Sequence, residues 1–128
     1  MTKFNEIKIS LAELAESRGI STHELNEEWN INYRVNLDED FERLTALLSN
    51  YMRIHRLALK QNDLLAARSA LVNARVIAHS LCSFFEDIKD DLILAAQSGL
   101  NRTDNRELDW PPLLDKYDFD EKYRNNQE

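Results

Sequence analysis

Residues 10–29, SLAELAESRGISTHELNEEW, decide how the beginning of this chain folds. Apolar residues recur every three or four positions on both sides of Gly19, which is the spacing of an amphipathic helix. Gly19 provides the turn, because glycine adopts a left-handed backbone conformation without strain. We therefore expect two short helices joined by a glycine turn. Their inward residues are Leu11, Leu14, Ala15, Ile20, Leu25 and Trp29.

Three pairs of polar residues have the spacing of a capping box, in which two side chains bind the free N–H groups at a helix start. The pairs are Ser10 with Glu13, Ser21 with Glu24, and Asn36 with Glu39. They predict helices that begin just after Ser10, Ser21 and Asn36. Residues 30–36 then form a connector of extended character.

The composition favours an all-α fold. The chain has 128 residues, of which 43% are hydrophobic, and only two glycines and two prolines. A single cysteine excludes an internal disulfide and fits a reducing compartment. We see neither a secretory signal nor an apolar run of the roughly 18 residues that span a membrane. We expect a cytoplasmic protein without a membrane segment.

The net charge of −7 is unevenly distributed. Residues 1–42 hold ten acids and four bases, and residues 76–128 hold twelve acids and six bases. Residues 43–75 hold six bases against Asp63 alone. This basic island fits phosphates or an acidic protein face, or it pairs with acids of its own chain or a partner subunit. Its main residues are Arg53, Arg56, Lys60 and Arg68.

Two long helices follow the connector, separated by the polar break at residues 61–63. Apolar side chains recur at alternating steps of three and four, the period of a coiled-coil seam. The first stripe is Leu37, Phe41, Leu44, Leu48, Tyr51, His55 and Ala58. The second is Leu64, Ala67, Leu71, Ala74, Ala78, Leu81, Phe85, Ile88, Leu92 and Ala95. These stripes predict an antiparallel hairpin that ends at Gly99.

The second long helix is longer than the first, so part of it needs another cover. At 1.5 Å per residue the two helices span roughly 35 and 55 Å. Either the N-terminal head folds back onto the excess or a second subunit covers it, and we expect a dimer or larger oligomer. The interface residues would be Leu81, Phe85, Ile88 and Leu92. Further apolar residues outside the stripe suggest a second buried face, and these are Leu65, Val72, Val76, Ile77, Phe84 and Ile93.

Residues 100–128 form a polar linker followed by an acidic-aromatic tail. Its apolar groups either dock on the helical body or form a motif for another protein. The motif residues are Trp110, Leu113, Leu114, Tyr117 and Phe119.

We find no motif for catalysis and expect neither an enzyme nor a cofactor. His79 and Cys82 share a helix face, but a metal site needs more ligands, so we predict no metal and a buried or half-buried Cys82. His55 lies on the apolar stripe and is interpreted as a satisfied core or interface histidine. The acidic run at residues 86–91 is interpreted as a solvated face.

The pattern at residues 10–29 resembles a helix-turn-helix, a unit whose second helix often enters a DNA major groove. Five glutamates in this stretch oppose phosphate contact, whereas exposed polar residues could read base edges. Double-stranded DNA and a protein partner are therefore both open as targets. The residues predicted to contact DNA are Lys8, Arg18, Ser21, Thr22, His23, Asn26 and Arg34.

The order of parts also resembles that of phage small terminase subunits. In that resemblance, residues 10–29 correspond to the head, residues 37–98 to the hairpin that drives assembly, and residues 108–124 to the C-terminal segment that contacts another protein. We accordingly divide the chain into a helix-turn-helix-like head at residues 1–35, a helical hairpin and oligomerisation region at residues 36–99, and a linker and acidic tail at residues 100–128. The resemblance favours a DNA-associated regulatory or packaging accessory protein. The alternative is an acidic, all-helical adaptor or inhibitor that binds a protein and not DNA. The hairpin at residues 51–74 also looks like one tetratricopeptide unit, which we interpret as generic helical packing.

Overall fold

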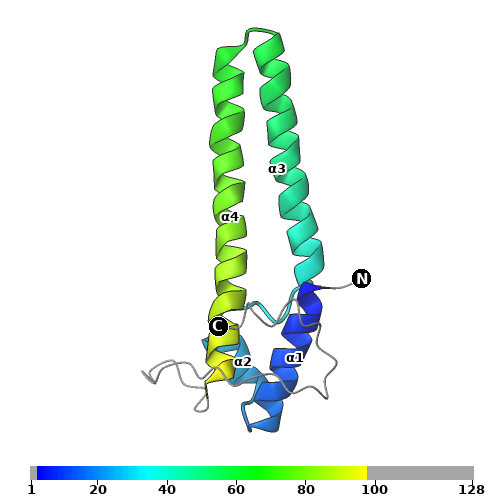
Figure 1. Ribbon diagram of the computed structural model, residues 1–128, viewed down its shortest axis with the longest axis vertical. Coiled ribbons are helices and arrows are strands. Elements are labelled where there is room, and N and C mark those ends of the chain that lie inside the picture. Colours follow the sequence, from blue (N-terminus) through cyan, green and yellow to red (C-terminus); the bar gives the residue numbers. More distant parts are fainter. Residues whose placement is uncertain (1–2, 98–128) are drawn as a thin grey trace, which may run out of the picture. The chain divides into compact units, whose positions relative to one another are not determined.

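The computed structural model describes residues 3–97, and within them the chain is all-α, as expected. Its four helices are α1 (Phe4–Ser17), α2 (Thr22–Glu28), α3 (Leu37–Lys60) and α4 (Leu64–Ala96) (Figure 1). The chain divides into two units, Met1–Leu92 and Ile93–Glu128. The first contains the three shorter helices and most of α4, and the described part of the second is the end of α4.

The turn between α1 and α2 is as the sequence predicts. Gly19 has a φ of 81°, and the Ile20 N–H donates to the Ala15 carbonyl over 2.9 Å. The Ser21 hydroxyl accepts the N–H of Glu24 over 3.1 Å and caps α2. The predicted helix start at Ser10 is wrong, because α1 begins at Phe4 and Ser10 is an exposed residue in its middle.

A carboxylate from α3 caps the N-terminus of α1. The backbone N–H groups of Lys3 and Phe4 donate to Asp38 Oδ1 over 3.0 and 2.9 Å, and that of Asn5 donates to Oδ2 over 3.1 Å. The N–H of Phe4 makes the largest contribution to holding the pKa of Asp38 below its usual value. Asp38 therefore replaces the missing cap, because no side chain of the residue before α1 makes a capping hydrogen bond.

The predicted starts of α3 and α4 are confirmed. Asn36 Oδ1 accepts the N–H of Glu39 over 3.1 Å, so α3 begins at Leu37. In the break between α3 and α4, Asn62 has a φ of 56°, and Asp63 Oδ1 accepts the N–H of Ala66 over 3.1 Å. Residues 30–36, expected to be extended, instead contain bends and a turn.

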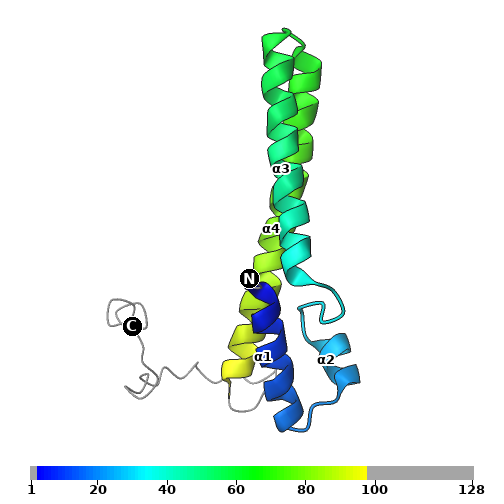
Figure 2. The ribbon, with the colours of Figure 1, turned by 90° about the vertical axis from the view of Figure 1, so that its right-hand side faces the viewer.

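Helices α3 and α4 run antiparallel, side by side (Figures 1 and 2). Near their connection, His55 Nδ1 lies 3.0 Å from the Ala67 carbonyl, which can only accept, so this nitrogen carries the proton. His55 is half-buried and bonded, as expected. At the other end, the rings of Phe41 and Phe84 lie 5.8 Å apart.

The inward face of α3 is the predicted stripe, whereas that of α4 is only half predicted. Ala67, Ala74 and Ile88 are buried as expected. The predicted positions Leu64, Leu71, Phe85 and Leu92 are instead 45–66% exposed. The second buried face is also wrong in part, because Leu65, Val72 and Val76 are exposed. The positions that complete the inward face are Ala70, Ile77, Phe84 and Asp91, of which Ile77 is half-buried.

Besides the hydrogen bonds between the start of α1 and the start of α3, an aromatic contact and a polar contact attach the N-terminal head to the hairpin. Phe4 of α1 lies 4.9 Å from the Phe41 ring and 5.2 Å from the Phe84 ring, measured between centroids. The second contact is polar. The fully buried carboxylate of Asp91 accepts the backbone N–H groups of Asn30 and Ile31, each over 2.8 Å.

The head therefore packs against the part of α4 that exceeds the length of α3, for which the sequence analysis expected another cover. Of the two covers considered for this part, the head is the one observed in the chain up to residue 92.

Candidate protein-interaction surface

Large apolar side chains are exposed on both helices where α3 ends and α4 begins. Leu65 is 81% exposed and Leu64 66% exposed, and the others lie between 38% and 52%. A concentration of exposed apolar side chains is typical of protein-binding surfaces. We call this set the tip surface, and it consists of Met52, Leu57, Leu59, Leu64, Leu65, Leu71, Val72 and Val76.

The predicted basic island lies on the same part of the hairpin. Arg53, Arg56, Lys60 and Arg68 are all exposed, and Arg53 donates to Asn50 Oδ1 over 2.8 Å. The only charged residue of opposite sign within residues 43–75 is Asp63. The apolar residues of the tip surface therefore lie among exposed basic residues. Such a surface complements a protein surface that is apolar and acidic.

The four residues predicted as the oligomer interface are only partly accessible. Ile88 is buried and Leu81 half-buried. Phe85 is 47% exposed, although its ring lies 5.8 Å from Phe4 and 5.3 Å from Phe84. Leu92 is 45% exposed. Only Phe85 and Leu92 offer substantial area to another molecule.

Two of the residues predicted to contact DNA already bind other groups of the chain. Lys8 Nζ donates to the Val35 carbonyl over 2.6 Å, and the Ser21 hydroxyl caps α2. Asn26 is half-buried, whereas Arg18, Thr22, His23 and Arg34 are exposed. Exposed glutamates share this surface, at positions 13, 16, 24, 27 and 28. The head is thus a poor electrostatic match for a phosphate backbone.

A cleft of about 600 Å³ lies between α1 and α2. Its walls include the apolar residues Ile9, Ile20 and Leu25, and Tyr33 and Arg34 of the connector. Some of the residues predicted to contact DNA therefore line a cleft rather than a projecting surface.

A second cleft, of about 500 Å³, lies where the connector meets α3 and α4. Asp40, Arg43 and Asp87 are among its walls. Burial, and then the neighbouring carboxylates of Asp91, Asp90 and Glu86, raise the pKa of Asp87 above its usual value.

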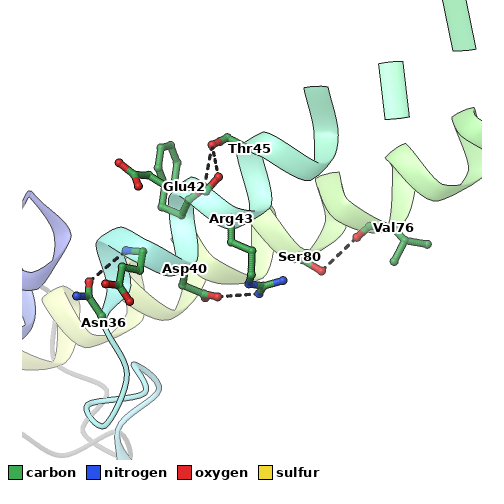
Figure 3. Close-up of polar contacts among 9 residues, drawn as sticks. Asn36, Asp40, Glu42, Arg43, Thr45, Val76 and Ser80 are labelled. Atoms are coloured by element: carbon green, nitrogen blue, oxygen red, sulfur yellow. Dashed lines mark hydrogen bonds and ion pairs between the residues drawn. The ribbon is translucent and has the colours of Figure 1, made fainter. Parts of the chain in front are cut away.

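The polar groups beside this second cleft largely satisfy one another. Arg43 donates to Asp40 Oδ1 over 2.7 Å, and Figure 3 shows both side chains on the side of α3 that faces Ser80 of α4. Ser80 donates to the Val76 carbonyl over 3.2 Å (Figure 3). These bonds hold the helices locally and assemble no nucleophile with a base.

No group of three or more His, Cys, Asp and Glu side chains within residues 3–97 is placed to hold a metal ion. Cys82, expected to be at least half-buried, is exposed. None of the described helices is both long and apolar enough to cross a membrane.

The sequence analysis missed the role of Asp91. It assigned the run at residues 86–91 to a solvated face, but Asp91 is fully buried and also accepts the Tyr33 hydroxyl over 3.0 Å. One signal was present, since Asp91 lies three residues after Ile88 and seven after Phe84, on the inward side of α4.

The predicted tail motif, from Trp110 to Phe119, and the predicted helix end at Gly99 lie outside the described residues. Among known proteins, no curated protein and no solved structure matches the chain. Residues 4–112 match the family described as "Family of unknown function (DUF6853)". Because the match spans more than half of the sequence, the chain belongs to the DUF6853 family.

Proposed function

We propose that the protein is a non-enzymatic protein-interaction module that binds apolar and acidic protein surfaces through the tip surface of its α3–α4 hairpin. The observation that carries this proposal is the exposure of eight large apolar side chains between Met52 and Val76. Leaving so much apolar area in water is unfavourable unless a partner covers it.

The charge pattern supports a protein partner. Five of the six bases in residues 43–75 are not balanced by an acid of that segment, so the tip attracts acidic surfaces. In this proposal the helix-turn-helix-like head is a packing unit that covers the lower part of α4, and the hairpin is the binding element.

The test uses the full chain as bait in a lysate of its source cells. We expect a partner, either foreign or a second copy of the chain, that wild type retains. At least one of two double variants, Leu59→Gln/Leu71→Gln or Leu65→Gln/Val72→Gln, should lose it, because the two change different sides of α4 and glutamine removes exposed apolar area without disturbing the core. Glu39→Gln/Glu42→Gln on exposed positions of α3 is the control and should retain it.

Circular dichroism verifies that the variants remain helical. The proposal is wrong if wild type retains neither a foreign protein nor itself, or if both tip variants bind as wild type does.

A further inference from the structure

The hairpin leaves one apolar line of helix α4 uncovered. Ala67, Ala74, Leu81 and Ile88 repeat every seven residues and face α3. The inward face is completed by the line from Ala70 to Asp91. The line on the opposite flank is entirely apolar and exposed, and it consists of Leu64, Leu71, Ala78, Phe85 and Leu92.

Helix α3 adds to the same side of the hairpin. Met52 and Leu59 are 38% and 49% exposed, and each follows an inward residue, Tyr51 or Ala58, by one position. On α4, Leu71 and Phe85 likewise follow the inward residues Ala70 and Phe84. Because α3 and α4 run antiparallel, the residue that follows an inward residue points to the same side of the hairpin on both helices. We call this combined face the side row.

The side row is long enough for a stable interface. From Leu64 to Leu92 it extends roughly 42 Å, and two adjacent helices are roughly 20 Å wide. A standard interface needs roughly 800 Å² on each partner, and a face of these dimensions supplies about that much.

Charge selects the occupant. The tip half of the hairpin, residues 43–75, has six bases and one acid. The base half has ten acids and four bases in residues 3–42, and four acids and one base in residues 76–92. An antiparallel second copy places each basic tip against an acidic base, whereas a parallel copy opposes like charges.

We propose that the side row binds a second copy of the chain in antiparallel orientation, forming a two-fold symmetric dimer of hairpins. The proposal rests on the proposed function and names the partner for the part of the tip surface that belongs to the side row, namely Met52, Leu59, Leu64 and Leu71. Each copy contributes the same residues, as a two-fold interface requires. Two-fold symmetry places the axis near Ala78, the middle of the exposed line.

Two substitutions on adjacent residues test the face. Leu71 and Val72 are 45% and 50% exposed. Leu71 lies in the side row, whereas Val72 lies about 100° further around the helix and points away from α3. In sedimentation of the full chain at tens of micromolar, we expect wild type near twice the chain mass of 15.0 kDa. Leu71→Gln should raise the dimer dissociation constant at least tenfold, and Val72→Gln should leave it unchanged.

A distance measurement tests the orientation. Cys82 is the only cysteine, so Gln61→Cys in a Cys82→Ser chain carries one spin label at the end of each hairpin. With the axis near Ala78, 17 residues away, an antiparallel dimer separates the labels by roughly 50 Å. A parallel dimer would bring them within roughly 20 Å of each other.

A wild-type monomer at these concentrations, a dimer broken by Val72→Gln and not by Leu71→Gln, or the short label distance would each overturn the proposal. If wild type is a monomer but still retains a foreign protein that the tip variants lose, the proposed function stands and only the second copy is wrong. If no protein is retained either, both are wrong.

Discussion

Single carboxylates fix the geometry of this protein more than ion pairs do. Asp38 gathers three N–H groups at the start of α1, and Asp91 gathers two N–H groups and a hydroxyl from the connector. Hydrogen bonds to a charged acceptor contribute more to stability than hydrogen bonds to a neutral acceptor do. The removal of either carboxylate therefore has a measurable cost.

We expect Asp91→Ala to lower the free energy of unfolding by about 3 kcal/mol or more, because the connector loses its acceptor. Asp90→Ala is the matched control. Within residues 3–97, the Asp90 carboxylate accepts one exposed hydrogen bond, from Asn30 Nδ2 at 3.0 Å, so its loss should cost less than about 1 kcal/mol. Urea denaturation measures both, and equal effects would contradict the role assigned to Asp91.

The Asp38 cap predicts a pH dependence. Because the pKa of Asp38 in the folded chain lies below its usual 3.8, the cap stabilises the protein fully above that pH. This stability is lost as the pH falls through the lowered pKa. We expect Asp38→Asn to reduce the melting temperature at pH 7, and the difference from wild type to shrink on acidification below pH 3.8. The exposed Glu42→Gln is the control, and a difference that is constant with pH would contradict the argument.

At the scale of the helices, caps and turns could be predicted from the sequence, because each is set by residues within four positions. Ser21, Asn36 and Asp63 cap as their spacing indicates, and Gly19 turns the chain. The start of α1 could not be predicted, because its cap is Asp38, distant in sequence.

The register of α4 was predicted one line away from the observed one. Ala67, Ala74 and Ile88 belong to both the predicted and the observed inward face. On each side of them, another line of residues repeats every seven positions and could complete that face. Sequence alone favours the flank from Leu64 to Leu92, which is apolar throughout, over the flank that ends in Asp91. The fold uses the latter because Asp91 finds donors in the connector, a contact that periodicity does not contain.

At the scale of the whole molecule, charge separates the two targets considered for the head. We expect no binding of mixed duplex DNA at 10 µM protein and 150 mM salt, because exposed glutamates surround α2 and would repel the phosphates. Fluorescence anisotropy measures this. Binding that weakens steeply with salt and with Arg18→Ala would favour the DNA-associated alternative.

The hydrogen bonds that Asn30 and Ile31 donate to Asp91 close a loop of about 60 residues. This loop closure affects the cooperativity of unfolding. The connector cannot leave α4 without exposing the buried carboxylate, so head and hairpin should melt in one transition rather than two. Limited proteolysis of native protein should therefore spare residues 29–33 until the hairpin itself opens. A head excised before residue 36 lacks both Asp38 and Asp91, and it should not keep its fold as a transplantable unit.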